Sequence, residues 1–339
     1  MKRIFILVAI ALFVMGSLVA EEAILIDFSK LTADIIPDQN DKPTQNRATV
    51  MDFSQVAGGS FTTEQKSVMK TSLAINSWEV KLASSSRTIG NQVRSYTLEA
   101  PSKQWGTVMG ARIHFPVEPW NSWATIKPPF EIPAFEPTGE VDDEGNVTAS
   151  EDSDGITGPS RFEDGYGVVK NVGTIKAVAA NVYGLNFPYA LYALLLDNQG
   201  VETKVYLGPL NHDGWAEHVW TNPAYVTEVR NREMRLYPLY PFSTPFVKFG
   251  GFLIQRDKDQ IGGDFITYFK DVKIIYDQAV LDTDRDIDDE SLWNIIKNRE
   301  AEKRTVEMNR FGENQVLRYL DTQRQATESQ FTPTPANEE

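Results

Sequence analysis

Two histidines in the stretch HDGWAEH, His212 and His218, are the first side chains whose type suggests chemistry, because imidazole is a common zinc ligand. They lie six residues apart, so they do not share one face of a helix. This spacing matches none of the helical zinc signatures. The remaining histidine, His114, is far away in the chain. The sequence therefore favours a turn or strand-end role for this pair over a metal site.

An acidic run near residue 285 suggests a calcium loop, which needs oxygen ligands at fixed spacing. If Asp282 were the first loop position, Ile287 would take the invariant glycine position and Trp293 the bidentate glutamate position. Starting from Asp284 gives no better match. The run instead predicts the acidic first turn of a helix, where the helix dipole favours negative charge.

The sequence contains no recognisable catalytic motif. It has no nucleophile elbow, phosphate loop or dinucleotide fingerprint, and no cysteine for thiol chemistry. A carboxylate pair for glycoside hydrolysis remains possible among 47 acidic residues, although nothing singles out such a pair. We therefore predict a protein that is not an enzyme and has no cofactor or metal, with a secreted hydrolase as an open alternative without named residues.

Two tryptophans, Trp120 and Trp123, stand in a proline-rich stretch at 116–137. Rigid amphipathic rings in such a loop suit a protein interface or a flat platform on which sugars stack. They suit a cap over one end of the fold equally well. Because proline removes ladder donors, the stretch is not expected to form a central strand.

Residues 1–20 have the features of a secretory signal peptide. Lys2 and Arg3 precede an apolar run, and small residues lead to a predicted cleavage between Ala20 and Glu21. The run is short for a membrane span, and no second apolar run follows. The absence of cysteine argues against a lipid anchor and excludes disulfides. We expect an exported, soluble protein with no membrane insertion after signal removal.

The charge balance argues against polyanionic partners. The chain has 33 basic and 47 acidic residues and a net charge of -14, which becomes -16 when Lys2 and Arg3 are removed (-14 - 2). Such a protein is repelled by nucleic acid and by anionic membrane surfaces.

The elements that must position these residues are mostly strands. Apolar and polar residues alternate with period two in short segments separated by turn-forming residues, and no helix separates them. This pattern predicts an all-β fold, an antiparallel jelly-roll-like β-sandwich. The predicted strands are Trp78–Ala83, Val93–Glu99, Thr107–Phe115, Val168–Val172, Thr174–Tyr183, Ala190–Asp197, Val201–Leu207, Phe246–Gln255 and Phe265–Asp277, while the topology of 210–241 is left unassigned.

The stretch Gly250–Asp277 is interpreted as a β-hairpin with Gly262 and Gly263 in its turn, at a closing edge of the sandwich. In its second strand, Val272, Ile274 and Tyr276 point to one side, which predicts a buried face. Asp271 and Lys273 point to the other side, which predicts a wet face.

The predicted organisation has four parts. A signal peptide at 1–20 precedes a β-sandwich domain at 21–280, which carries an acidic loop insertion at about 138–160. A charged α-helical tail follows at 281–326, and a disordered end occupies 327–339.

Several sequence blocks of the chain resemble the spirochaete flagellar filament outer layer (sheath) proteins of the FlaA family. They are Ile26-Asp27-Phe28, Trp78–Leu82, Ser84–Pro101, Gly110–Pro116, Gly167–Tyr189 and GGDFITYFKDVKIIYD near 270. The resemblance implies a periplasmic structural protein that sheathes a core of FlaB-type flagellins and tunes filament stiffness, shape and motility. Other sheath subunits, including copies of this chain, would be its neighbours. A secreted carbohydrate-binding β-sandwich module, with Trp120 and Trp123 stacking on sugar rings, is the alternative.

Overall fold

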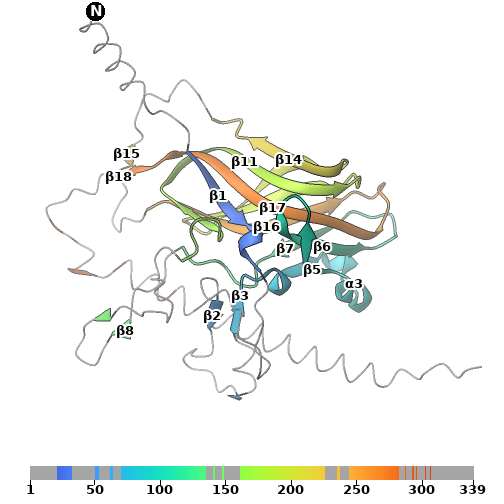
Figure 1. The fold of residues 1–339 in the computed structure, drawn as a ribbon, viewed down its shortest axis with the longest axis horizontal. Helices are drawn as coiled ribbons and strands as arrows, with labels where there is room; N and C mark the ends of the chain where they lie inside the picture. Colours follow the sequence, from blue (N-terminus) through green and yellow to red (C-terminus); the bar gives the residue numbers. More distant parts are fainter. Residues whose placement is uncertain are drawn as a thin grey trace, which may run out of the picture.

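The computed structural model describes most of the region between residues 21 and 281 (Figure 1). The predicted signal peptide, most of the acidic insertion and nearly all of the predicted helical tail lie outside the described residues. The described residues are 21–32, 50–52, 62–63, 70–134, 140–141, 147–148, 161–225, 235–236 and 244–281, together with 287, 292, 293, 295, 302 and 306.

Two antiparallel six-stranded sheets form the body, and we call the first of them sheet I. Its strands follow the order β14-β11-β17-β6-β5 from top to bottom in Figure 1, and β1 pairs with the second half of β17. The bounds are β14 (Asp213–Thr221), β11 (Val172–Leu185), β17 (Gly263–Gln278), β6 (Gly106–Phe115), β5 (Tyr96–Ser102) and β1 (Glu21–Asp27).

The second sheet, sheet II, has the order β13-β12-β16-β7-β4, with β10 paired to the start of β16. All its pairs are antiparallel. The bounds are β13 (Glu202–Pro209), β12 (Ala190–Asp197), β16 (Phe246–Arg256), β7 (Ser122–Lys127), β4 (Glu79–Leu82) and β10 (Val168–Lys170).

Short elements surround the two sheets. Three small pairs of strands and a few single helical turns are described outside them. They are β2 (Val50–Asp52) with β3 (Lys70–Ser72), β8 (Glu140–Val141) with β9 (Val147–Thr148), β15 (Arg235–Leu236) with β18 (Val280–Leu281), the turns η1 (Phe28–Lys30), η3 (Ile75–Ser77) and η4 (Ser84–Ser86), and the helix α3 (Ile89–Val93).

The core lies between the sheets and is rich in phenylalanine. Phe252 of sheet II stacks on Phe269 of sheet I, with ring centroids 4.0 Å apart and an interplanar angle of 16°. Phe28, Trp78 and Phe249 form edge-on or tilted contacts beside them. Each such ring contributes about 1.5–3 kcal/mol through burial, so this aromatic cluster is a main link between the layers.

The predicted β-sandwich is confirmed, as are several of the predicted faces. Trp78, Val80 and Leu82 are all buried on the inner side of sheet II. In β6, Ala111, Ile113 and Phe115 are buried and the intervening Arg112 and His114 are not, as expected. The alternation of apolar and polar residues predicted the buried face correctly here, because one face of each strand packs against the core.

The predicted hairpin at Gly250–Asp277 is wrong. Both strands exist, but β16 belongs to sheet II and β17 to sheet I, so the connection at 257–262 crosses between the layers. Neither strand is at an edge, because β16 lies between β12 and β7 and β17 lies between β11 and β6. Alternating patterns and a glycine turn do not distinguish a hairpin from such a crossing, since both place two half-buried strands in succession.

The wet face predicted for β17 is wrong at Asp271. Its carboxylate is fully buried, pairs with the Lys270 ammonium and accepts a hydrogen bond of 2.7 Å from the Asn181 amide. The β17 pairing with β11 shifts register in this region, so the inward positions change from Phe269 to Val272. This shift and the cover provided by β1 explain the buried carboxylate. Lys273 remains on the outer side, where its ammonium lies 2.9 Å from a carboxylate oxygen of Glu22 in β1.

The proline-rich stretch contains a strand in the interior of sheet II, contrary to expectation. The strand β7 lies between β16 and β4, and its Ala124 and Ile126 are fully buried. The prolines flank this strand at Pro119 and Pro128 without interrupting it. The backbone N–H groups of β7 that bond the neighbouring strands are therefore all present.

The strand predicted from Val93 begins later. Val93 ends the helix α3, which together with η4 lies between β4 and β5. In β5, Tyr96 and Leu98 point outward, whereas Thr97 is buried and donates a 2.8 Å hydrogen bond to the Ile75 carbonyl. Because the inward residue Thr97 is polar and its outward neighbours are apolar, the alternation predicted the wrong face of this strand as buried.

The strand β11 is longer than the predicted strand Thr174–Tyr183, because it continues through Gly173 and Gly184. The chain leaves extended conformation at Asn171 and Asn186 instead, with φ angles of 58° and 61°. Asparagine is the residue that tolerates this region best after glycine. The unassigned segment 210–241 contains β14, the outer strand of sheet I.

The predicted tail helix is described at five residues, namely Leu292, Trp293, Ile295, Glu302 and Val306, which are helical and exposed. In the described parts of the chain, no helix is long and apolar enough to cross a membrane.

Candidate interaction surfaces

The two histidines of HDGWAEH are close in space. The His212 and His218 rings are 4.8 Å apart between centroids, at the edge where β14 begins. Burial lowers the pKa of His218, and the charge of His212 lowers it further. Among the described residues, no group of three or more His, Asp or Glu side chains is arranged to hold a metal ion. His212 lies in the turn before β14, whereas His218 lies within this edge strand, in register with Ala180 of β11.

The two tryptophans predicted as an interface or a platform are both partly exposed. Trp120 is in the loop 116–121, which connects the two sheets at one end of the sandwich, and its side chain is 44 % exposed. Trp123 is in β7, the strand that follows this loop, and points away from the core, because its neighbour Ala124 faces inward.

Arg256 holds the loop of Trp120 in place. This guanidinium, at the end of β16, is almost completely buried. It donates hydrogen bonds to the carbonyls of Pro116, Glu118 and Gln260, with lengths of 2.8 Å to Glu118 and 3.0 Å to Gln260. One side chain thereby ties the loop 116–121 to the connection 257–262, and we call this part of the surface the Arg256 end.

Further bonds stiffen the same end. The Lys258 amide donates a 2.9 Å hydrogen bond to the Asn121 side chain, and the Tyr189 hydroxyl donates to the Ile261 carbonyl. Backbone groups in these loops are thus held by side chains from several elements, which lowers the entropy lost if the end binds a partner.

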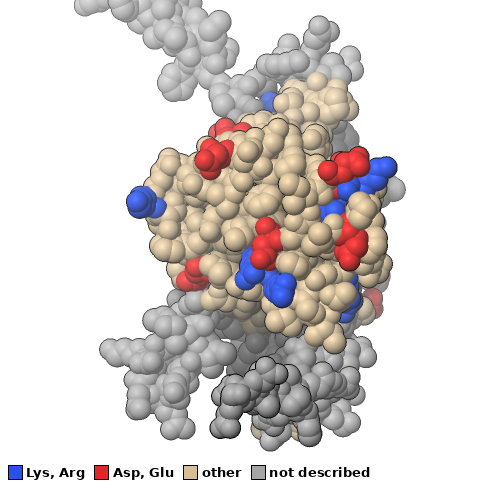
Figure 2. Space-filling view, turned by 90° about the vertical axis from the view of Figure 1, so that its right-hand side faces the viewer, with Lys and Arg blue, Asp and Glu red and all other residues tan. Residues whose placement is uncertain are grey.

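The Arg256 end presents apolar side chains to solvent. Val117 is 76 % exposed and Ile261 is 87 % exposed, beside the half-exposed Trp120. The connections between β6 and β7 and between β16 and β17 lie at the right-hand side of Figure 1, and Figure 2 shows this side as uncharged surface with separate groups of acidic and basic side chains. The two loops also carry the exposed charged residues Glu118, Asp257, Lys258 and Asp259. Large apolar groups with polar and charged residues around them are typical of an interface.

A second surface, which the sequence did not reveal, crosses the outer face of sheet I. One row of register partners runs through all five strands of its main path, and we call it the aromatic row. Its members are Trp215 of β14, Tyr183 of β11, Tyr268 of β17, Gly110 of β6 and Leu98 of β5.

The rings of this row contact each other edge to face. Tyr183 lies 5.4 Å from Trp215 and 5.8 Å from Tyr268 between ring centroids. Trp105, from the turn before β6, packs 6.4 Å from Trp215, and the Lys270 ammonium lies 4.7 Å from the Trp105 ring. Such pairs stabilise aromatic clusters at a sheet surface by about 0.5–1.5 kcal/mol each.

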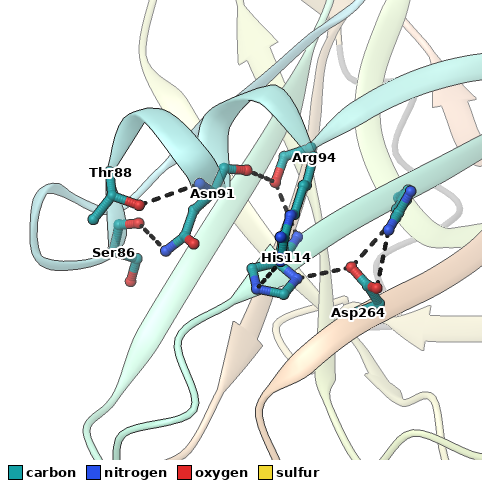
Figure 3. A network of polar contacts seen from close by, with 8 residues as sticks. Ser86, Thr88, Asn91, Arg94, His114 and Asp264 are labelled. Atoms are coloured by element: carbon teal, nitrogen blue, oxygen red, sulfur yellow. Dashed lines mark hydrogen bonds and ion pairs between the residues drawn. The ribbon is translucent and has the colours of Figure 1, made fainter. Parts of the chain in front are cut away.

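A polar network lies next to the aromatic row, farther along β6 and β17. The Arg112 guanidinium binds both carboxylate oxygens of Asp264 at 3.3 and 2.9 Å, and His114 Nδ1 lies 2.8 Å from the same carboxylate. Figure 3 shows the His114 ring between Arg94 and Asp264. Hydrogen bonding to Arg112, and then to His114, lowers the pKa of Asp264, and the same contact raises that of Arg112.

The aromatic row escaped sequence reading because its members come from distant strands. Tyr183 and Tyr268 are 85 positions apart (268 - 183), and their adjacency depends on a strand order that alternation does not specify. The signal that was available is local: both tyrosines occupy the solvent side of alternating strands, where a polar residue is the usual choice.

Comparison with known proteins gives a consistent family. The family model described as flagellar filament outer layer protein FlaA matches residues 42–285. A flagellar filament outer layer protein of Treponema pallidum (strain Nichols) is 49 % identical over 98 % of this chain and 97 % of its own length. The protein of the same name from Spirochaeta aurantia is 45 % identical over 98 % of this chain and 95 % of its own length.

Similar solved structures are remote. A carbohydrate-binding module of the β-sandwich superfamily covers 59 % of this chain and 57 % of its own, with a TM-score of 0.28 and 9 % identity. The family 11 carbohydrate-binding module of a Clostridium thermocellum cellulase covers 61 % of this chain and 91 % of its own, with a TM-score of 0.26 and 7 % identity. Scores this low support no inference about a ligand.

Proposed function

The chain belongs to the FlaA family of flagellar filament outer layer proteins, and we propose that it is a structural subunit of the layer that covers a flagellar filament. The observation that carries this proposal is 49 % identity to a protein of that name over nearly the full length of both chains. The described body suits the role, because a repeated subunit needs a stable scaffold with several distinct contact surfaces.

The subunit acts in the periplasm, around a core of FlaB-type flagellins and beside further copies of itself and other sheath proteins. Its role there is mechanical, with no enzymatic activity. The sequence features of a signal peptide at 1–20 support export. The strand β1 begins at Glu21, the residue that the predicted cleavage leaves first, and it is paired with Tyr276 of β17. Cleavage at Ala20 thus spares the sheet.

We assign the sandwich to the jelly-roll class and retain the helical tail as a second contact element. Eight of its strands give the sheet orders β6-β17-β11-β14 and β7-β16-β12-β13, the arrangement of two interlocked Greek keys. The charged tail predicted at 281–326 follows this body in the sequence, and we propose that it contacts a neighbouring subunit.

The Arg256 end is the proposed contact with a neighbouring sheath subunit. Its apolar groups are held by a buried guanidinium, so little conformational entropy is lost when they are covered. Trp120 is the central group, because tryptophan is enriched among residues that dominate binding energy. Trp123, on the outer side of β7 and in register with Gln255 next to Arg256, is a further proposed contact point.

Immunogold labelling of purified filaments tests the assignment. Antibody against this chain should label filaments along their length, and labelling confined to soluble periplasmic material would contradict it. To test the contact, the double variant Trp120→Ala, Ile261→Ser is added, together with unmodified copies of the chain, to filaments stripped of their outer layer. The variant should lose most of its binding to these filaments. Tyr206→Ala, which removes a comparably exposed ring from edge strand β13, should bind normally. Normal assembly of the double variant would refute the role of the Arg256 end.

A further inference from the structure

The short helix α3 presents two apolar side chains to solvent. Ile89 and Val93 are 67 % and 60 % exposed, and their spacing of four residues places them on one face of the helix. None of the residues of α3 is buried, so burial in the core does not account for its apolar side chains. Exposed apolar groups that lie together on a surface are a candidate contact with another protein.

Polar side chains fix α3 to both sheets. Gln92 donates a 2.8 Å hydrogen bond to the carbonyl of Val80 in β4 of sheet II. Ser95, just after the helix, donates a 2.7 Å hydrogen bond to the Asn91 carbonyl and accepts one of 2.9 Å from the backbone N–H of His114 in sheet I (Figure 3). The apolar face of α3 is therefore held on a rigid support, which lowers the entropy lost when a partner covers it.

The surroundings of α3 are basic, although the protein is acidic. Residues 80–117 contain five basic residues and one acidic residue, a net charge of +4 (5 - 1), whereas the whole chain carries -14. Two of these basic residues are exposed and lie beside the apolar pair in the sequence. We call the four exposed residues Arg87, Ile89, Val93 and Arg94 the α3 surface.

The two arginines of the α3 surface have no acidic partner within the described part of the chain. The Arg94 guanidinium contacts the His114 ring, with 3.4 Å between Nη1 and Nε2. The carboxylate beyond this ring, that of Asp264, is already bound by Arg112 and His114. Among the described residues, neither Arg87 nor Arg94 forms an ion pair with a carboxylate. The α3 surface therefore suits a partner that combines acidic and apolar side chains.

The C-terminal tail of the same chain has this composition. From Asp282 to Glu290 it carries six acidic residues and one basic residue, a net charge of -5 (1 - 6). Leu292, Trp293 and Ile295 come next, and these three described residues are helical and exposed. Copies of an acidic chain repel each other overall, so a contact between them needs opposite charges at the point where they meet. The tail and the α3 surface supply such a pair.

The tail begins at the end of the body opposite to the α3 surface. α3 lies near the start of β17, because His114 binds Asp264 there, whereas the tail follows the end of β17 and then β18 (Figure 1). The 16 residues of β17 extend over about 50 Å. The 12 residues from Leu281 to Trp293 (293 - 281) reach about 43 Å when fully extended, which falls short of the α3 surface of the same chain. A neighbouring copy has no such restriction.

We propose that the α3 surface binds the acidic and apolar start of the tail, residues 282–296, of a second copy of this chain. The contact gives the tail its partner and rests on the proposed role as a repeated subunit of the filament layer. Because it joins two different surfaces of identical subunits, it does not close into a symmetric dimer but continues from one subunit to the next in a single direction.

Thiol cross-linking of the mature chain tests the contact, because the chain has no cysteine of its own. The single variants Val93→Cys and Leu292→Cys are mixed and treated with a short bismaleimide. The mixture should give a cross-linked dimer, and each variant alone should give much less of it. Val219→Cys, a comparably exposed position in the edge strand β14, is the matched control and should not cross-link to Leu292→Cys.

Charge reversal tests the same contact without a cross-linker. The double variant Arg87→Glu, Arg94→Glu should weaken self-association of the mature chain at least tenfold in sedimentation equilibrium, because attraction becomes repulsion. A chain that also carries Asp288→Lys, Asp289→Lys should recover self-association, since the charges are then exchanged. Lys103→Glu, Lys204→Glu makes the same change in net charge at exposed positions outside the α3 surface and should leave self-association within twofold.

The proposal is overturned if Val93→Cys and Leu292→Cys do not cross-link, or if a chain with both cysteines cross-links only within itself, which indicates that the tail binds its own body. It is also overturned if reversal at Arg87 and Arg94 leaves self-association unchanged or acts no more strongly than the lysine control. Loss of filament binding by the arginine variant with unchanged self-association indicates another filament protein at α3 and overturns it too. Antibody labelling of filaments is independent of these results, so a failure here is distinct from a failure of the role in the layer.

Discussion

Replacing Arg256 by methionine should destabilise the protein strongly. The guanidinium is almost fully buried and donates to three carbonyls, of Pro116, Glu118 and Gln260. A hydrogen bond that involves a charged group contributes about 1.5–3 kcal/mol. The loop carbonyls regain part of this by binding water once the side chain is gone. We therefore expect a loss of about 3–5 kcal/mol in the free energy of unfolding, the range seen when one partner of a buried charged network is removed.

Urea unfolding followed by circular dichroism measures this loss, with the slope against urea concentration checked for two-state behaviour. Arg112→Met is the matched control, because Arg112 makes a bidentate ion pair with Asp264 at a partly exposed site and should contribute about 1 kcal/mol or less. If Arg256→Met costs no more than Arg112→Met, the Arg256 end is not held as described.

Three further predictions concern the backbone and two titrating groups. Gly251→Ala should cost more than about 2 kcal/mol in unfolding free energy, because the residue has φ of 124° and its Cβ would collide with a neighbouring carbonyl, whereas Gly200→Ala, with φ of 79° and open space, should cost about 1 kcal/mol; equal losses would contradict this. The pKa of Asp264 is lowered in the folded protein, so ionised Asp264 stabilises the fold above its ordinary pKa near 4, and this stabilisation is lost as pH falls through the lower pKa of the folded state. The free energy of unfolding of Asp264→Asn should therefore depend less on pH in acid, and identical curves for the variant and the original protein would contradict this. Burial raises the pKa of Tyr276 to about 12, so neutral Tyr276 stabilises the fold below pH 10 and this contribution is lost as pH rises toward 12; ultraviolet titration of Tyr276→Phe should lack one late tyrosine, and a missing early one would contradict the assignment.

Local alternation predicted which residues enter the core but not which strands become neighbours. The inward faces of β4 and β6 were predicted correctly, since each strand has one side against the other sheet. The crossing from β16 to β17 was taken for a hairpin because sheet membership is decided by contacts between distant segments. The interior strand β7 was missed because the number of prolines near it was weighed, and not their positions at its ends.

The candidate surfaces were predicted in part. Trp120 and Trp123 were singled out by composition, but the sequence does not show that Trp120 lies in a loop and Trp123 on the outer side of β7. Arg256 gave no signal, because a single arginine after an apolar strand is usually solvated. Its role depends on three carbonyls brought together by two loops. The aromatic row needed the complete strand order of sheet I before its members became neighbours.

The crossing between β16 and β17 also affects how the subunit bears mechanical load. β16 is hydrogen-bonded on both sides within sheet II, and β17 is hydrogen-bonded on both sides within sheet I. The middle of one sheet thus continues covalently into the middle of the other, and Arg256 closes the corner. A force applied to one outer face is carried through the backbone to the opposite face as well as through side-chain packing. The two layers are therefore linked by the backbone as well as by side-chain packing, which suits a subunit of the outer layer of a filament.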